Sequence, residues 1–508
     1  MELEQKEKSP KKKSLGLNYI YNLLYQIFLI IVPLATTPYI ARVLGDDGSG
    51  KYSFCFSIVT YFILFASLGF NIYGQRETSK YQDDIKTQSK VFWEIFICRF
   101  IPFIITIIIF IGMIVLNVYS KEYNNLILIF GLQIVATVFD VTFLFQANEE
   151  FGIVVLRNFI IKLITIVCIF VFVRERNDLS IYVFIQSISV LVSSLSLWVS
   201  LPRCLTKVSI KNLHPLKHLV PTLILFLPTI ATSVYTSLDK TLIGVLVEGT
   251  TSVVLPDGSL VIKNIADIEN GNYEYAEKVV KLTFTIVTAL GIVMIPRNSK
   301  MFKDNDIEGV KNNIYKSLKY VFFIALPLMF GLILISDIFI PWFLGDDYKK
   351  AIGLMKLLSP LVLIIGISNV FGLQYLIPAG KDKKFTIAIT SGALCNLVLN
   401  LILIRFIQSY GAAIGTVIAE LLIAVIMYFM VRKDISIKIV FKNCWKFVVA
   451  SVVMLVVGLL VSTVISTNLI GLVILVLVSV IVYLVILIIL KEEYIKIGLD
   501  FIKSKLSR

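Results

Sequence analysis

The feature that most constrains this chain is a succession of apolar stretches, about fourteen in all, each long enough to cross a bilayer as a helix. Hydrophobic residues make up 57% of the 508 residues and charged residues only 16%, a balance that water-soluble domains do not have. The pattern predicts an all-α polytopic membrane protein with spans at residues 18–40, 52–73, 91–117, 125–147, 153–173, 179–199, 219–247, 273–296, 320–343, 357–378, 385–404, 411–431, 446–466 and 468–490.

The charges between these stretches predict how the chain is threaded through the membrane. Lys and Arg number 48 against 34 Asp and Glu, and they concentrate in alternate connecting segments instead of forming one basic face. Basic residues gather on the cytoplasmic side of membrane proteins. With the Lys-rich start "KEKSPKKK" on that side, both termini are expected to be cytoplasmic. The net charge of +14 is therefore topological, and no nucleic acid partner is expected.

One outer connection, "LGDDGSGKYS" at residues 44–53, is similar to a phosphate-binding loop. Tyr52 stands where such a loop needs Ser or Thr, and Asp46 and Asp47 would repel phosphates. The predicted topology also places the loop outside the cell, so no nucleotide site is expected. Six scattered Cys and two His in one basic inner loop indicate neither a metal site nor a cofactor.

Two predicted spans share an internal repeat that suggests two lobes. The eighth span comes six positions after the second in the order of spans, an even number that preserves their orientation. The repeat predicts two parallel six-helix lobes with two extra C-terminal helices, whereas a second "LGDD" at residues 344–347 is out of step and is interpreted as coincidence. The repeated residues are Gly50, Tyr52, Leu68, Gly69 and Arg76, matched by Gly271, Tyr273, Leu290, Gly291 and Arg297.

The predicted organisation follows from the spans and the repeat. It comprises a basic cytoplasmic N-terminus (residues 1–17), an N-lobe (18–199), a cytoplasmic linker (200–218), a C-lobe (219–431), helices 13 and 14 (432–490) and a basic amphipathic tail (491–508). The tail is expected to lie on the inner leaflet. The longest outer loop, residues 248–272, has a predicted hairpin turn at Pro256–Gly258 and is too short for a catalytic domain, so no enzyme is expected.

Charged side chains inside the spans are the candidate functional residues, because each costs at least about 2.5–3.5 kcal/mol at mid-bilayer. Among the charged residues singled out, the basic ones outnumber Asp140, Asp239 and Glu420, which favours an anionic passenger; they are Arg99, Lys162, Lys240, Lys278 and Lys281. The candidates for substrate binding are Arg99, Lys162, Lys240 and Asn396, and those for coupling or gating are Asp140, Asp239 and Glu420.

Structural roles compete with these functional ones. Arg99 and Asp140 could pair with each other, and Lys278 and Lys281 could extend to the outer headgroups. Asn396 shares one helical face with Asn400, which suits either helix packing or the lining of a cavity.

Several stretches together resemble a known family across nearly the whole chain. They are "SLGFNIYGQRETSKYQDD", "DVTFLFQANEEFGIVVLRN", "YTSLDKTLIG", "GNYEYAEKVVKLTFTIVTALGIVMIPR", "QYLIPAGKDKKFT", "GALCNLVLNLILI" and "YGAAIGTVIAE". In order and spacing they resemble the Wzx-type flippases of surface polysaccharide biosynthesis, in the multidrug/oligosaccharidyl-lipid/polysaccharide exporter superfamily.

This resemblance implies a passenger and a location. The passenger would be an oligosaccharide repeat unit on undecaprenyl pyrophosphate, moved from the inner to the outer leaflet of the bacterial cytoplasmic membrane for capsule, O-antigen or exopolysaccharide synthesis. Proton or sodium coupling and a polysaccharide polymerase partner would be compatible with it. Family-patterned positions are Gly74, Arg76, Glu77, Asp140, Gln146, Glu149, Glu150, Arg157, Asp239, Lys240, Pro296, Arg297, Pro378, Asn396, Asn400 and Glu420.

Three rival functions are weighed against this one. A lipid II flippase would differ only in its sugars. A cation-coupled multidrug exporter calls for acidic residues in the first span, and residues 18–40 carry no charge. A membrane polysaccharide polymerase calls for a long outer loop with clustered Arg, His or carboxylates, whereas residues 248–272 contain one Lys and no His. The expected mechanism is alternating access, with Lys162, Lys240 and Arg99 meeting the diphosphate.

Overall fold

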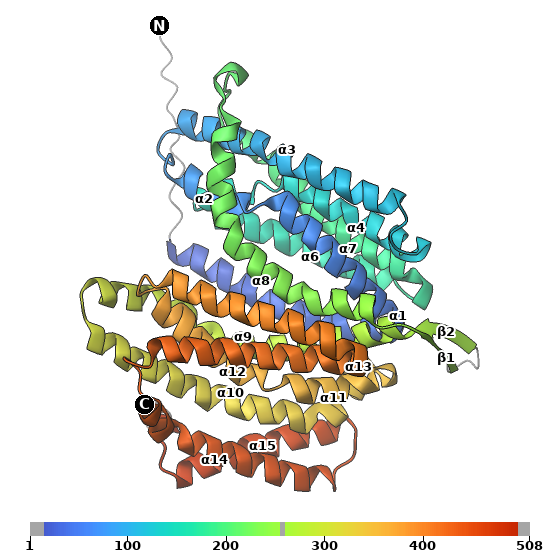
Figure 1. Ribbon diagram of the computed structural model, residues 1–508, viewed down its shortest axis with the longest axis vertical. Helices are drawn as coiled ribbons and strands as arrows, with labels where there is room; N and C mark the ends of the chain where they lie inside the picture. The colour runs from blue at the N-terminus through green and yellow to red at the C-terminus, as the bar shows by residue number, and fades with distance from the viewer. Residues whose placement is uncertain (1–14, 255–259, 496–508) are drawn as a thin grey trace. The chain divides into compact units, whose positions relative to one another are not determined.

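The computed structural model describes residues 15–254 and 260–495, which are almost entirely helical (Figure 1). The helices of the first half are α1 (Leu15–Ser67), α2 (Phe70–Ser79), α3 (Ile85–Val115), α4 (Lys121–Phe139), α5 (Thr142–Ala147), α6 (Phe151–Phe172) and α7 (Leu179–Ser196). The second half comprises α8 (Leu219–Leu246), β1 (Thr250–Val254), β2 (Leu260–Asn264), α9 (Ile265–Lys303), α10 (Ile307–Leu344), α11 (Lys349–Leu358), α12 (Leu361–Phe371), α13 (Asp382–Val431), α14 (Ile437–Ser462) and α15 (Leu469–Ile489).

The predicted all-α membrane fold is confirmed. Among the described residues, nine helices are long and apolar enough to cross a membrane, or ten if the bent pair of segments within residues 346–376 is one span. Two of these helices, α1 and α13, each cover two of the predicted spans. The exact number of fourteen stays a prediction.

Two of the longest helices are interrupted by a few residues with non-helical backbone. In α1, Gly45 has φ 70° and ψ −179°, a conformation that costs glycine little because it has no Cβ. In α13, Ile407 and Gln408 break the helix, and Gln408 has φ 53°. These breaks fall between the predicted spans 18–40 and 52–73, and between 385–404 and 411–431. The apolar pattern therefore locates the crossings, but the chain passes between them without a long loop.

The chain forms two compact units. The first comprises Val59–Leu227 and the described residues before Pro38, and the second comprises Pro38–Ile58 and the described residues from Pro228 onward. The division within the second half falls inside α8, and the sequence-based lobe boundaries stay predictions. In the first unit α4 packs on α7, α6 on α7, and α2 on α5.

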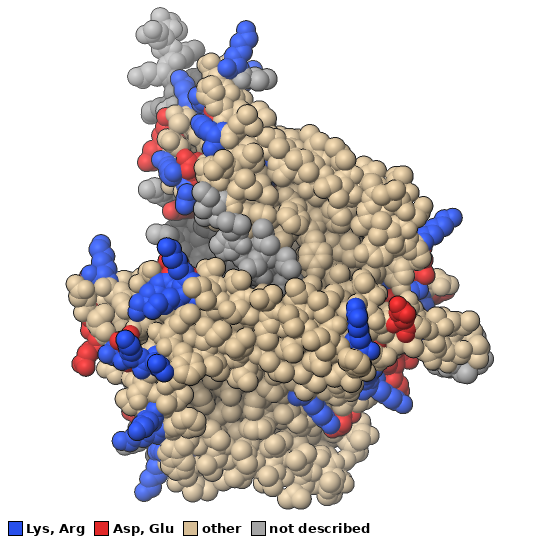
Figure 2. Space-filling view, viewed as in Figure 1, with Lys and Arg blue, Asp and Glu red and all other residues tan. Residues whose placement is uncertain are grey.

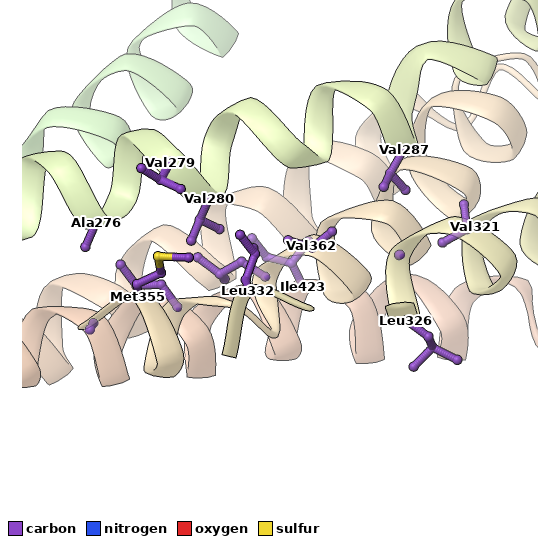
Figure 3. Packing of buried hydrophobic residues seen from close by; sticks show 14 of the residues in the cluster. Ala276, Val279, Val280, Val287, Val321, Leu326, Leu332, Met355, Val362 and Ile423 are labelled. Atoms are coloured by element: carbon purple, nitrogen blue, oxygen red, sulfur yellow. The ribbon is translucent and has the colours of Figure 1, made fainter. Parts of the chain in front are cut away.

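The second unit is built around α9, α10, α12 and α13. Its core contains aliphatic and aromatic residues, and Val280 of α9, Met355 of α11, Val362 of α12 and Ile423 of α13 are among the aliphatic ones (Figure 3). Lys, Arg, Asp and Glu gather towards the two ends of this unit's helices and leave a band with few charged residues between them on the face that is shown (Figure 2). Such a band suits a bilayer, where apolar helix surfaces face lipid and association depends on close packing.

A short antiparallel hairpin occupies the predicted outer loop. Strands β1 and β2 pair with Thr250 opposite Asn264 and Val254 opposite Leu260. The predicted turn at Pro256–Gly258 lies outside the described residues, as does the predicted interfacial helix from residue 496 onward. The hairpin leads directly into α9, whose first turn is capped by the Asn264 side chain accepting a hydrogen bond from the Ala266 N–H at 3.0 Å.

Candidate functional site

The candidate site in the second unit is centred on two adjacent residues of α8, Asp239 and Lys240. Neighbours on a helix point about 100° apart, so the two side chains reach different surroundings. Asp239 faces α9 and α13, whereas Lys240 faces carboxylates on α9. A single helix therefore carries two distinct polar sites.

The Asp239 carboxylate is the centre of a buried network of neutral groups. Tyr273 donates to Oδ2, Thr416 donates to the same oxygen at 2.6 Å, and Asn400 Nδ2 donates to Oδ1 at 2.5 Å. Asn396 joins the network by donating to Thr416 Oγ1 at 3.2 Å and accepting from Asn400 Nδ2 at 3.1 Å. No cation pairs with Asp239 among the described residues, and Asn400 Oδ1 is buried without a hydrogen-bond partner.

This network is chemically incomplete as it stands. A carboxylate in a membrane interior is costly unless a proton, a cation or a paired side chain neutralises it. Neutral donors reduce that cost but leave the net charge in place. The arrangement can therefore hold a proton on Asp239 or accept a small monovalent cation beside it. Among the described residues, no group of three or more His, Cys, Asp or Glu side chains is arranged to hold a metal ion.

Lys240 is held by carboxylates that the sequence interpretation did not single out. Its Nζ forms ion pairs with Glu274 and, at 3.1 Å, with Glu277. Lys281 pairs with Glu277 at 2.6 Å, and Ser53 Oγ of α1 donates to Glu274 at 3.1 Å. The signal in the sequence was the segment "YEYAEKVVK", in which two Glu residues each precede a Lys by four positions, the spacing of neighbours on a helix.

Arg99 and Asp140 lie together in the first unit, in a closed cluster. The Arg99 guanidinium, 1% exposed, donates to the Asp140 backbone carbonyl and to Asn71 Oδ1, and Asn71 Nδ2 donates to Asp140 Oδ2 at 2.8 Å. The Phe143 ring lies 5.3 Å from the guanidinium carbon. Asp140 sits at the break between α4 and α5, where its side chain accepts from the Thr142 N–H. This geometry fits the structural role that was weighed for the pair.

The remaining candidates are more scattered. Lys162 lies part-exposed on α6 of the first unit, and no hydrogen bond or ion pair of its side chain occurs among the described residues. Glu420 is half-buried on α13, four residues after Thr416, and therefore about one helical turn from the Asp239 network. The structure thus brings Asp239, Asn396 and Lys240 into one region, whereas Arg99, Asp140 and Lys162 belong to the other unit.

The stretch that is similar to a phosphate loop instead forms a close helix crossing. A Cβ added at Gly50 would lie 1.7 Å from the Asp267 carbonyl oxygen, and one added at Gly271 would lie 2.0 Å from the Asp46 carbonyl oxygen. Backbone lies against backbone, so there is no room for a phosphate. The glycines that meet here are the pair matched by the internal repeat.

The hairpin contributes a buried lysine to the same region. Lys263 of β2 is 4% exposed and pairs with Asp46 at 2.5 Å and with Asp47 at 2.9 Å. Burial alone would lower the pKa of Lys263, but the hydrogen bonds and charges of the two carboxylates outweigh it and raise that pKa. The lysine therefore stays charged and offsets part of the negative charge of Asp46 and Asp47.

The fold defined by these helices is that of a membrane transporter. Solved structures of similar fold include a lipid II flippase MurJ in an inward closed conformation, with a TM-score of 0.70 at 18% identity over 94% of this chain and all of that one. An inward-facing multidrug resistance MATE family transporter of the MOP superfamily gives a TM-score of 0.60 at 12% identity over 83% of this chain and 95% of that one.

Sequence comparison then gives the family. The profile of a family described as "Polysaccharide biosynthesis protein" matches residues 15–302, and a second profile with the same description matches residues 257–353. The chain belongs to the polysaccharide biosynthesis protein family. It is 26% identical over 431 residues to a "Putative O-antigen transporter" of Escherichia coli (strain K12), covering 83% of this chain and 98% of that relative. The Wzx-type resemblance drawn from the sequence is confirmed.

Proposed function

We propose that the protein is a flippase that moves undecaprenyl-pyrophosphate-linked oligosaccharide repeat units from the inner to the outer leaflet of the bacterial cytoplasmic membrane. The product would supply capsule, O-antigen or exopolysaccharide synthesis. The observation that carries the proposal is Lys240, a cation retained within a predicted span and accompanied by Lys278 and Lys281. Three lysines against the two carboxylates of Glu274 and Glu277 leave a surplus positive charge, which suits a diphosphate.

The mechanism we infer is alternating access, in which the cationic site opens to one side of the membrane at a time. Lys240 would meet the diphosphate. Lys162 and Arg99, the other contacts predicted from the sequence, lie in the first unit, where Arg99 is occupied by Asn71 and the Asp140 carbonyl. No nucleotide is required. An inside-negative potential of about 100 mV favours outward movement of an anion by about 2.3 kcal/mol per charge. The charge pattern supports cytoplasmic termini, and a polysaccharide polymerase would be the natural consumer of the outward product.

Ion coupling is the second part of the proposal. The buried Asp239 carboxylate, surrounded by Tyr273, Thr416 and Asn400 without a cation, supports binding of a proton or a sodium ion there. Neutralising Asp239 would lower the cost of holding α8 packed against α9 and α13. Because Lys240 is the next residue, occupancy at Asp239 can influence the orientation of the cationic site.

Two rivals share the fold. The MurJ likeness supports a lipid II flippase, which would differ in the sugars carried. The MATE likeness supports a multidrug exporter, but the surplus of lysines around Lys240 disfavours a cationic passenger.

The test is the leaflet location of the lipid-linked oligosaccharide. Cells that lack the protein should accumulate this lipid on the cytoplasmic face, protected from an external glycan label. The wild-type gene should restore labelling, and Lys240→Ala should not, although the variant protein remains in the membrane. Lys356→Ala is the matched control, because Lys356 pairs with Asp337 on an exposed surface where ion pairs contribute little.

Other outcomes of this test would indicate a different function. Labelled but unpolymerised repeat units outside the deletion cells would indicate a polymerase. An unaltered lipid pool with new sensitivity to cationic drugs would indicate an exporter. Trapping of the peptidoglycan precursor alone would indicate a lipid II flippase.

A further inference from the structure

The carboxylates that hold Lys240 have other cations available on their own helix. Glu274 precedes Lys278 by four residues, and Glu277 precedes Lys281 by four, the order in which i,i+4 pairs on a helix are most favourable. The Glu277–Lys281 pair is already formed at 2.6 Å. Lys278 lies close enough to attract the Glu274 carboxylate electrostatically. Each carboxylate therefore has one partner on α9 in addition to Lys240 of α8.

This surplus changes what removal of Lys240 would cost. A buried carboxylate that loses its only cation is left uncompensated, which is strongly destabilising. Here Glu274 and Glu277 would keep Lys278 and Lys281, so two carboxylates would remain balanced by two lysines. Lys240 can therefore leave the two carboxylates without a net negative charge remaining on α9. Its own ammonium would then need a new anionic partner.

The cluster is also open enough for such a partner to reach it. The side chains of Lys240 and Glu274 are 16% and 24% exposed, and that of Lys281 is 41% exposed. By contrast, the neighbouring Asp239 is 4% exposed and its oxygens are occupied by Tyr273, Thr416 and Asn400. An incoming anion would therefore meet the Lys240 side of α8 and not the Asp239 side.

We propose that the site works by exchange of ion pairs: the diphosphate takes Lys240 from Glu274 and Glu277, which stay neutralised by Lys278 and Lys281. This inference rests on the proposed function and adds Glu274, Glu277, Lys278 and Lys281 as positioning residues. Glu274 and Glu277 act as stand-ins for the substrate when the site is empty. They balance the charge of the ammonium and keep it in place, so that Lys240 is presented in a fixed position.

The exchange requires no proton. Among the described residues, the charged and titratable groups that interact with the two carboxylates include Asp239 and Lys240 on α8 and Tyr273, Lys278 and Lys281 on α9. Ser53 of α1 is a hydroxyl that contacts Glu274. Because lysines on α9 replace Lys240 at both carboxylates, neither needs to be protonated when the anion binds. Diphosphate binding at this site is therefore expected to take up no protons between pH 6.5 and 8 (an interval of about one and a half units around neutrality).

The experiment measures binding of undecaprenyl diphosphate, without sugars, to the purified full-length protein in detergent. Lys240→Gln should weaken binding by about tenfold or more, because a charge-assisted contact is lost. Glu274→Gln should tighten binding severalfold, since the anion no longer competes with that carboxylate. Lys278→Gln should also weaken binding, because Glu274 would lose its lysine on α9. Glu274 would then hold Lys240 more strongly against the incoming diphosphate. Lys356→Gln is the control and should bind as wild type does.

If these ion pairs only hold α8 against α9, the effect of Glu274→Gln on lipid binding should differ. In that case Glu274→Gln would bind the lipid no more tightly than wild type, and this result would overturn the exchange. Glu277→Gln provides the same test if thermal unfolding shows that Glu274→Gln is misfolded. Absence of wild-type binding would also overturn it. These failures leave the flippase assignment intact as long as deletion cells still trap the lipid-linked oligosaccharide, so the two proposals fail independently.

Discussion

Arg99 in the first unit and Lys240 in the second are both cations inside predicted membrane spans, yet their surroundings differ. Arg99 is 1% exposed and its partners, Asn71 and the Asp140 carbonyl, are fixed by other contacts. Lys240 is part-exposed and shares its two carboxylates with lysines of α9. An intramembrane charge is therefore a good candidate for binding only when its partners can be replaced. Among the described residues, no second cation is placed in the first cluster to replace Arg99.

The same contrast applies to acidic residues. Asp140 lies at a helix break, where it orders the chain by accepting from the Thr142 N–H and from Asn71. Asp239 lies in mid-helix, where its hydrogen bonds join three helices without neutralising its charge. A carboxylate that organises a break has a structural task, whereas one that links helices and stays uncompensated can change its state. Substitution of these residues tests which of the two tasks each one has.

The largest effect is expected from removing the Arg99 charge. Arg99→Met should destabilise the first unit by about 3–5 kcal/mol, because Asn71 and the Asp140 carbonyl lose their buried donor. The thermal midpoint of the purified protein should fall well below that of Arg174→Met, the replacement of an exposed arginine in the same unit. If Arg99→Met folds but binds undecaprenyl diphosphate poorly, Arg99 belongs to the substrate site. Arg99 and Lys240 would then have the same role.

An intermediate effect is expected at Asp239. Asp239→Asn preserves the shape of the side chain but cannot accept from all of Tyr273, Thr416 and Asn400, so about 1–3 kcal/mol of stability should be lost. If Asp239 binds the coupling ion, flipping by this variant in vesicles should no longer respond to an imposed proton or sodium gradient. If flipping by this variant still responds to both the proton and the sodium gradient, Asp239 does not bind the coupling ion. Thr416→Val is the matched control, since it removes one donor but leaves the charge.

The sequence predicts the membrane class well and the site only in part. Apolar runs near 20 residues mark the crossings because the bilayer imposes that length. The shared face of Asn396 and Asn400 followed from their i,i+4 spacing, and their hydrogen bond confirms it. Glu274 and Glu277 were missed because they lie in the outermost turns of a predicted span, where charges are usually solvated. Tyr273 and Thr416 could not be assigned to Asp239, because contacts between residues 34 and 177 positions apart depend on packing, not on local pattern.

The smallest effect is expected from a buried histidine of the first unit, just before α8. His218 is 2% exposed, with Tyr73 OH at 2.7 Å from Nδ1 and Glu94 Oε2 at 3.2 Å from Nε2. Burial lowers the pKa of His218, and the nearby Lys217 adds to this, whereas the hydrogen bond and charge of Glu94 oppose it without cancelling it. The fold therefore favours neutral His218 more than the unfolded chain does.

The sign of the pH dependence follows from that lowered pKa. Its contribution to stability is complete above the unfolded value of about 6.5 and is lost as pH falls through the lower pKa of the folded state. The thermal midpoint of wild type should drop slightly more than that of His218→Gln between pH 7.5 and pH 5.5. The expected difference is small, because one histidine with a modest shift is involved and Glu94 offsets part of the cost. If the thermal midpoint of wild type falls by the same amount or less, the Glu94 contact outweighs the effect of burial. His218 and Glu94 would then form a pair that tolerates a change of charge, as the Lys240 site is proposed to do.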